Sequence, residues 1–211
     1  MRDVGGFASA VDGCEAVFHT AAYFREYYQP GSHAEALEAI NVRGTLALLD
    51  AAQLRGVRRF IHVGSSGTIG RKPDGSPGDE DTPPAAIATG NGYFSSKVET
   101  AAALDERRSR GGLEVIEILP GWMWGPGDAA PTGAGKLALD FLGGRVPIIP
   151  AGGVSTVDAR DVAAAMLTAC ERAPAGARYI VGGHHATMAE VLRLLEEVSG
   201  VAGPRRRLPH P

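Results

Sequence analysis

The chain has 211 residues, a net charge of −3 and a hydrophobic fraction of 44%, which are values typical of a globular protein. They exclude a disordered chain, and the lack of an overall basic field argues against nucleic acid or an anionic membrane as a partner. Two distant cysteines, Cys14 and Cys170, fit a reducing compartment. Since there is also no membrane-spanning run or signal-peptide core, we expect a cytoplasmic protein.

The first half of the chain alternates short apolar runs with periodic segments. Short apolar runs predict buried strands, and apolar residues at helical spacing predict helices. Strand and helix in alternation are the signature of parallel βαβ units, so we expect an α/β fold with a Rossmann-like, doubly wound parallel sheet. The expected strands are 16–19, 60–63 and 115–119, and the expected helices are 34–55 and 93–110.

This alternation changes after Gly125-Pro126-Gly127, and the later elements are shorter. We therefore predict two domains: a cofactor-binding domain at 1–125, and a smaller substrate lobe at 126–211. Before that boundary, a polar loop rich in proline and glycine runs from Arg71 to Asn91, and its length favours a functional role. The expected elements of the lobe are helices 135–142, 159–171 and 188–199 and strands 146–149 and 179–181.

Tyr93 and Lys97 lie four residues apart on a predicted helix, so their side chains share one face. A free tyrosine, with a pKa near 10, exchanges protons poorly at neutral pH. A lysine ammonium one turn away stabilises the phenolate and lowers that pKa. The spacing therefore predicts a general acid/base that donates a proton to a carbonyl oxygen or removes one from an alcohol.

A hydroxyl is expected near this pair, because the predicted strand 60–63 ends in Gly64-Ser65-Ser66. The carboxyl ends of parallel strands form the edge where doubly wound folds bind ligands. A serine at that edge can hydrogen-bond a substrate oxygen and hold it toward the tyrosine. An ordinary Ser/Gly turn remains the alternative interpretation.

Several short motifs along the chain occur in the order that one family shows. They are Val17-Phe18-His19-Thr20-Ala21-Ala22, Asn41-Val42-Arg43-Gly44-Thr45, Phe60-Ile61-His62-Val63-Gly64-Ser65-Ser66, Tyr93-x-x-x-Lys97, Leu119-Pro120-Gly121-Trp122-Met123-Trp124-Gly125-Pro126-Gly127 and Val157-Asp158-Ala159-Arg160-Asp161-Val162-Ala163. Together they resemble the extended short-chain dehydrogenase/reductases, also called the NAD-dependent epimerase/dehydratase superfamily, and most closely the branch of dihydroflavonol reductases.

The resemblance implies roles for particular residues. Tyr93 would be the general acid/base, Lys97 would tune it and hold the nicotinamide ribose, and Ser65 would orient the substrate carbonyl, with Ser66 as the alternative. Asn41 would support the active site by hydrogen bonds, unless it is a helix-surface residue. The implied cofactor contacts are Thr20, Ala21, Ala22, Asn41, Val63, Gly64, Tyr93, Lys97, Pro120, Gly121 and Met123, and the implied substrate contacts are Ser66, Gly67, Asn91 and Trp122.

The family's glycine-rich G-x-x-G-x-x-G loop, which joins the first strand to the first helix and holds the pyrophosphate, is not recognised here. Neither Gly5-Gly6 nor Gly152-Gly153 matches it. We therefore expect the chain to be a fragment that binds dinucleotide weakly or not at all, with NAD and NADP left undistinguished. The flank of strand 16–19 would be bare, which predicts poor solubility or pairing through that edge, such as a homodimer.

The first functional hypothesis is an NAD(P)-dependent oxidoreductase that acts on a small-molecule substrate and reduces a ketone or aldehyde, or oxidises the alcohol. A nucleotide-sugar epimerase of the same superfamily stays open. A dehydratase is disfavoured, because Gly67-Thr68 follow the strand-end serines where acidic residues are usual. A catalytically inactive truncated or nucleotide-sensing relative is a third hypothesis. No metal site is expected, because His184-His185 in a Gly-Gly-His-His turn lacks a third ligand.

Overall fold

A computed structural model describes residues 1–24, 29–108 and 111–208, and leaves out the side chains of residues 87 and 89. The expected end of the helix 93–110 and the chain end at 209–211 therefore lie outside the described residues. The chain forms two compact units: residues 1–120 with 163–181, and residues 121–162 with 182–211. Assignment of a cofactor-binding and a substrate-binding role to two parts of the chain stays a prediction.

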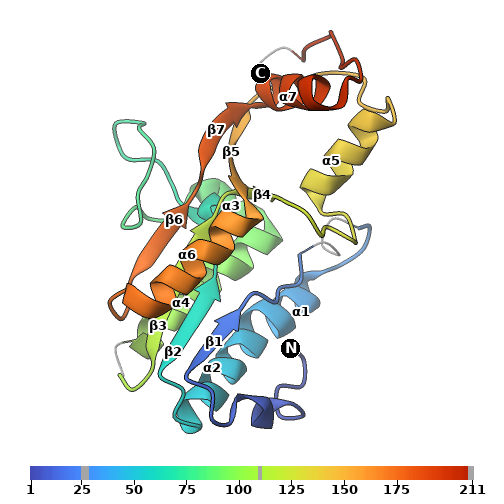
Figure 1. The fold of residues 1–211 in the computed structure, drawn as a ribbon. Coiled ribbons are helices and arrows are strands. Elements are labelled where there is room, and N and C mark those ends of the chain that lie inside the picture. The colour runs from blue at the N-terminus through green and yellow to red at the C-terminus, as the bar shows by residue number, and fades with distance from the viewer. Residues whose placement is uncertain (25–28, 109–110, 209–211) are drawn as a thin grey trace. The chain divides into compact units, whose positions relative to one another are not determined.

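A parallel sheet of four strands forms the centre of the first unit, in the order β1-β2-β3-β6 (Figure 1). The strands are β1 (Ala16–His19), β2 (Arg59–Val63), β3 (Glu114–Pro120) and β6 (Arg178–Val181). The α/β class and the first three strands are confirmed. The strand expected at 179–181 was wrongly given to the smaller lobe, because it pairs with β3 and completes the main sheet.

Helices cover the sheet, and the long helix expected at 34–55 is interrupted. It is α1 (Ala34–Leu37), then a π-helical stretch at Glu38–Gly44, then α2 (Thr45–Leu54). Periodicity alone does not predict the wider turn, which frees backbone carbonyls for other partners. Two further helices of this unit are α3 (Ala86–Gly90) inside the long polar loop and α4 (Gly92–Arg108), and single 3-10 turns lie at Ala8–Val11 and Ser66–Thr68.

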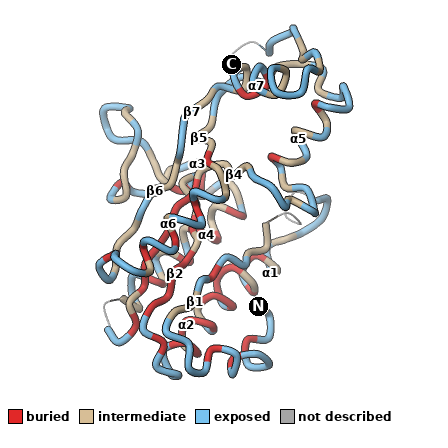
Figure 2. Tube along the Cα trace, in the orientation of Figure 1, coloured by how far each residue is buried: buried red, intermediate tan, exposed pale blue. Residues whose placement is uncertain are grey.

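The core of the first unit lies between the sheet and the helices α2 and α4. Phe60, Leu49 and Leu104 are fully buried there, with Val115 beside them. Alternate strand residues point to this face, so the apolar residues of β2 and β3 pack against the apolar stripe of each helix. Figure 2 shows the buried residues concentrated along these strands and helices.

Helix α6 (Ala159–Arg172) begins in the second unit, and its later part packs on the opposite face of the main sheet (Figure 1). Arg59 of β2 fixes this packing, because its guanidinium donates to the carbonyls of Ala169 and Ala173 at 3.0 Å each, and to Cys170. The last carbonyls of a helix lack intrahelical partners, so a buried cation there satisfies them.

The second unit contains a separate three-stranded sheet in the order β4-β5-β7. The strand expected at 146–149 is wrong: only an isolated bridge joins Ile149 to Arg207, and Pro147 cannot donate to a ladder. The expected Gly-Gly-His-His turn is instead the start of a strand at His184. The elements are β4 (Trp122–Trp124), α5 (Gly133–Leu142), β5 (Gly153–Asp158), β7 (His184–Thr187) and α7 (Met188–Ser199).

Candidate active site

Tyr93 and Lys97 lie in the first turns of α4, and both are buried, with 8% and 5% of their surface exposed. The ammonium nitrogen of Lys97 is 5.9 Å from the centroid of the Tyr93 ring. Asn91 precedes the helix, and its Oδ1 accepts a hydrogen bond from the Phe94 amide at 3.2 Å. That bond caps the helix start, so Asn91 helps to place the pair, while its expected contact with substrate stays a prediction.

Lys97 is anchored to the end of β2, where its Nζ donates to the carbonyl of Val63 at 2.8 Å. Burial lowers the pKa of Lys97 from 10.5 to about 8, and the negative charge of Glu117 opposes that effect. The ammonium is therefore mostly protonated at neutral pH, and it holds a positive charge between the strand end and the ring of Tyr93.

Ser65 follows β2 and begins the turn Ser66–Thr68. Its Oγ accepts from the amide of Gly67 at 3.2 Å, and its carbonyl accepts from the Thr68 hydroxyl at 2.7 Å. The turn packs on α4, because a Cβ at Gly67 would lie 2.5 Å from a ring carbon of Phe94. One helix therefore carries the tyrosine and supports the serine turn, and the candidate catalytic residues belong to one unit.

Aromatic rings surround Tyr93. The ring centroid of Phe24 lies 4.8 Å away, and the Phe94 ring stands edge-on at 5.4 Å. Such packing restricts the phenol to a narrow range of orientations. The acid/base candidate is thus held from two sides, by its own helix and by the segment that follows β1.

Asn41 lies in the π-helical stretch with 2% of its surface exposed, so it is a buried residue and not a helix-surface one. Its side chain accepts from the Tyr23 amide at 2.7 Å, donates to the Tyr23 carbonyl at 3.2 Å and donates to Ser96 Oγ at 3.0 Å. The hydroxyl of Thr100 lies 3.0 Å from the Asn41 carbonyl. Asn41 therefore joins the segment after β1 to α4, and its expected cofactor contact stays a prediction.

The other expected cofactor contacts divide between the two units. Thr20 and Ala21 follow β1 and are exposed, and Ala22 is half-buried. Pro120 ends β3 and is buried. In the second unit, a Cβ at Gly121 would lie 2.5 Å from the Ser155 carbonyl oxygen, so only glycine fits there. The remaining expected contacts of that unit, Trp122 and Met123, lie on β4, where the rings of Trp122 and Trp124 pack edge-to-face at 4.9 Å.

The sequence interpretation missed a row of four ionisable side chains across the main sheet. The parallel registers pair His19 with His62, His62 with Glu117, and Glu117 with Arg178. Neighbours in register point to the same face, here the face that α4 covers. A glutamate in the middle of the apolar run 115–119 was the signal available in the sequence.

Both histidines of this row are buried and held neutral. Burial and the nearby Lys97 charge lower the pKa of His19 to about 4, and burial lowers the pKa of His62 well below its usual value. His19 Nε2 lies 2.8 Å from the Thr45 hydroxyl. Neither ring nitrogen of His62 has a hydrogen-bond partner among the described residues.

One segment has the glycine spacing of the phosphate-binding loop, so the expectation that no segment of the chain matches this motif is corrected for the sequence pattern. Gly64, Gly67 and Gly70 have the G-x-x-G-x-x-G spacing. They follow β2, however, and lead into a 3-10 turn and an isolated bridge from Ile69 to Pro84, with no helix opening there. A pyrophosphate site needs a helix N-terminus directed at the anion, so this segment is the serine turn of the candidate site.

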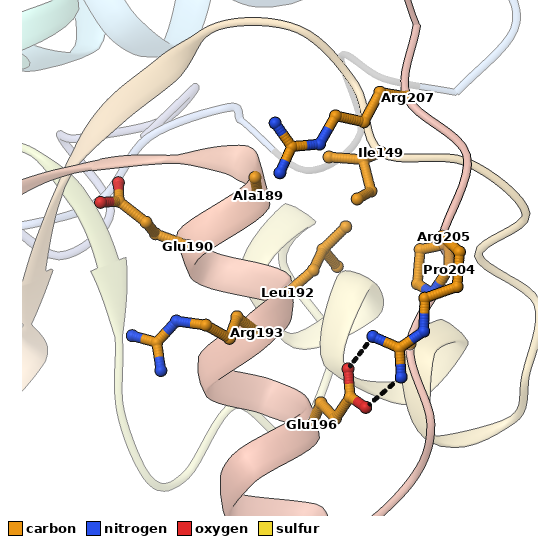
Figure 3. A pocket seen from close by; sticks show the side chains of 10 residues that line it. Ile149, Ala189, Glu190, Leu192, Arg193, Glu196, Pro204, Arg205 and Arg207 are labelled. Atoms are coloured by element: carbon orange, nitrogen blue, oxygen red, sulfur yellow. Dashed lines mark hydrogen bonds and ion pairs between the residues drawn. The ribbon is translucent and has the colours of Figure 1, made fainter.

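A hollow of about 270 Å³ lies in the second unit, between α7 and the segment 203–207 (Figure 3). Arg205 on its wall is paired with Glu196 at 2.7 Å. None of the expected site residues lines it, and we assign it no role.

In the part of the chain that the structure describes, no helix is long and apolar enough to cross a membrane.

Comparison with known proteins points to one family. The model of the NAD dependent epimerase/dehydratase family matches residues 2–182. A sterol demethylase protein B of Methylococcus capsulatus is 34% identical over 99% of this chain and 62% of its own length. A putative dihydroflavonol 4-reductase of Synechocystis is 30% identical over 97% of this chain and 60% of its own. The chain thus spans about three-fifths of the length of these relatives.

Solved structures are similar across the whole chain. The crystal structure of gox2253 has a TM-score of 0.89 and 30% identity, and covers 98% of this chain and 62% of its own. A UDP-glucose 4-epimerase of Thermus thermophilus in complex with NAD has a TM-score of 0.80 and 26% identity, and covers 100% of this chain and 70% of its own. The related proteins therefore include both reductases and epimerases, within one Rossmann-like fold.

Proposed function

The chain belongs to the NAD dependent epimerase/dehydratase family, and on that premise we propose that its site serves an NAD(P)-dependent oxidoreductase acting on a small ketone, aldehyde or alcohol. The observation that carries the proposal is the buried Tyr93–Lys97 pair, with Lys97 bonded to the β2 end that leads into Ser65. The similarity to a putative dihydroflavonol 4-reductase supports a reductase.

In this proposal Tyr93 exchanges a proton with the substrate oxygen. The positive charge of Lys97 favours the phenolate, because an opposite charge nearby stabilises an anion in a buried site. Ser65, at the strand end, would donate a hydrogen bond to the same oxygen and orient it. The rings of Phe24 and Phe94 hold the phenol in place, so little reorganisation is needed for proton transfer.

The residues at this edge of the first unit fit a nicotinamide cofactor. Thr20 and Ala21 are exposed small residues after β1, and the buried ammonium of Lys97 is a donor suited to ribose hydroxyls. The bound cofactor would supply or accept the hydride. We propose that these residues hold the nicotinamide end, with NAD and NADP equally compatible.

The test is the variant Tyr93→Phe, with the conversion of reduced cofactor followed on a panel of small ketones and aldehydes. The assay uses millimolar cofactor, since the sequence predicts weak dinucleotide binding. Loss of the hydroxyl should lower kcat by about 10²- to 10⁴-fold, the usual contribution of general acid–base catalysis. Tyr179→Phe, on the half-exposed surface of β6, is the matched control. Equal turnover by wild type and Tyr93→Phe would contradict the proposal.

A second candidate is a nucleotide-sugar epimerase, which the similarity to an epimerase structure with NAD supports. An epimerase oxidises and reduces the same sugar carbon, so it gives no net change in cofactor. Incubation with UDP-glucose and catalytic NAD separates the two functions. Formation of the 4-epimer without net cofactor reduction would favour the epimerase, and net conversion of a simple carbonyl would favour the reductase.

A further inference from the structure

Glu117 is the one buried carboxylate among the residues that the structure describes, with 1% of its surface exposed. It lies in the middle of β3, whose other residues on the same face, Val115 and Leu119, are apolar. A carboxylate in such a position is costly unless it is paired and hydrogen-bonded. Its position therefore depends on specific partners.

Those partners are arginines. Arg178 of β6 donates from Nε to Glu117 at 2.9 Å, and Arg108 of α4 lies 3.9 Å away. Arg178 also donates to the carbonyl of Glu80 at 2.9 Å, and the Glu80 carboxylate accepts from the Ile180 amide at 2.8 Å. The buried charge thus links the sheet, the catalytic helix and the long polar loop.

The same carboxylate lies against the end of β2. A Cβ at Gly64 would be 2.8 Å from Oε1 of Glu117, so the backbone there rests directly on this group. Gly64 stands between Val63, whose carbonyl binds Lys97, and Ser65. Glu117 therefore supports the short segment that carries two parts of the candidate site.

Charged and titratable groups face Lys97 from four elements. The two imidazoles on β1 and β2 are neutral, since burial lowers the pKa of both, and Glu117 raises the pKa of Lys97 against the effect of burial. Among the titratable side chains of this set, Glu117 thus carries the negative charge, and the others are neutral or positive. The set is His19 of β1, His62 of β2, Glu117 of β3 and Tyr93 of α4, while Arg108 of α4 and Arg178 of β6 lie against Glu117.

We propose that Glu117 is a positioning residue that keeps Lys97 charged in its buried place beside Tyr93 and supports the strand end that carries Ser65. It acts through Lys97, and contact with substrate is no part of its role. The inference rests on the proposed function only for the catalytic meaning of Lys97. The electrostatic link between Glu117 and Lys97 can be measured without cofactor.

The experiment uses the small number of lysines, which are Lys72, Lys97 and Lys136. The chain is labelled with ¹³C at lysine Cε, and the three NMR signals are followed as a function of pH. Lys97→Met assigns the Lys97 signal by its loss, and the exposed Lys72 and Lys136 serve as internal references. Glu117→Gln should lower the pKa of Lys97 from about 8 to about 7 or below, the size of effect that removal of one nearby opposite charge has.

Two further variants guard against a merely structural effect. Glu117→Asp keeps the negative charge, so the pKa of Lys97 should stay close to its wild-type value. Glu114 lies on the same strand and is paired with Arg58 and Arg59, and Glu114→Gln should leave the pKa of Lys97 unchanged. If Glu117→Gln does not fold, the double variant Glu117→Gln with Arg178→Gln removes both charges and keeps hydrogen-bonding groups. Because removal of the Arg178 charge partly offsets removal of the Glu117 charge, the double variant should lower the pKa of Lys97 by less than Glu117→Gln alone.

A folded Glu117→Gln or double variant whose Lys97 signal titrates as in the wild type would overturn the inference. The outcome is distinguishable from failure of the proposed function. Equal turnover by wild type and Tyr93→Phe would contradict the reductase and leave the titration result intact, whereas an unchanged titration would contradict the role of Glu117 and leave the Tyr93 test intact.

Discussion

The two ends of one face of the main sheet differ in chemistry, although the same strands build both. Toward the start of the strands, Phe60, Leu49 and Leu104 pack with no exposed surface. Toward the carboxyl ends, the row that contains His62 and Glu117 lies under α4, with Lys97 above it. One end buries apolar area, which stabilises the fold, and the other end buries polar groups, which is costly and positions charges.

This difference separates the part of the sheet face that stabilises the fold from the part that positions charged groups. A sheet with a fully apolar face would be easier to fold, because a buried charge is costly unless it is paired and hydrogen-bonded. For Glu117 the partners are Arg178 of β6 and Arg108 of α4, and Arg178 also donates to the carbonyl of Glu80 in the long loop. The contrast can be tested by changing one end at a time.

The largest effect on stability is expected at the apolar end. Phe60→Ala removes a fully buried ring from β2 and should lower the free energy of unfolding by about 3–5 kcal/mol. Leu54→Ala, at a leucine with 84% of its surface exposed, is the control and should change it by about 0.5 kcal/mol or less. Urea unfolding measures both. Similar losses for the two variants would break the comparison.

The polar end should make the protein sensitive to acid. The pKa of His19 is about 4 in the folded chain and 6.5 in the unfolded one, so between these values the unfolded state binds more protons. Stability should therefore fall as pH drops from 6.5 to 4, by about 3 kcal/mol for this group. His19→Gln keeps a polar group near Thr45 but does not titrate, and its loss between the two pH values should be smaller. Urea unfolding at each pH gives the difference, and identical pH dependence of wild type and variant would count against it.

A smaller effect is expected where the polar region leaves the sheet, at Asn41. Asn41→Ala removes its bonds to the Tyr23 backbone and to Ser96, which leaves buried groups unpaired. The expected loss of unfolding free energy is about 1–3 kcal/mol. Gln53→Ala, which removes one exposed bond to the Gly111 carbonyl, is the control, with an expected change within about 0.5 kcal/mol. Thermal unfolding of the two variants side by side decides whether the polar support contributes more than a surface contact.

Much of the fold was predictable because it depends on local pattern. The strands at 16–19, 60–63 and 115–119 follow from short apolar runs, and helix α4 follows from its periodicity. The strand at 179–181 was found but assigned to the smaller lobe, because so short a run does not indicate which sheet it joins. The π-helical stretch was not foreseen either, since its wider turn is stabilised by contacts from α4 and the segment after β1.

The sequence by itself determined the family, the α/β class and the pairing of Tyr93 with Lys97. The pair and each strand depend on residues close together in the chain, and the family depends on the order of short motifs along it. Only the tertiary structure decided the protonation of Lys97 in that pair. The pKa of Lys97 depends on its burial and on Glu117, 20 positions away by residue number on another strand. Electrostatic interactions depend on distance and solvent exposure, and the parallel register that brings His62 and Glu117 side by side cannot be read from either strand alone.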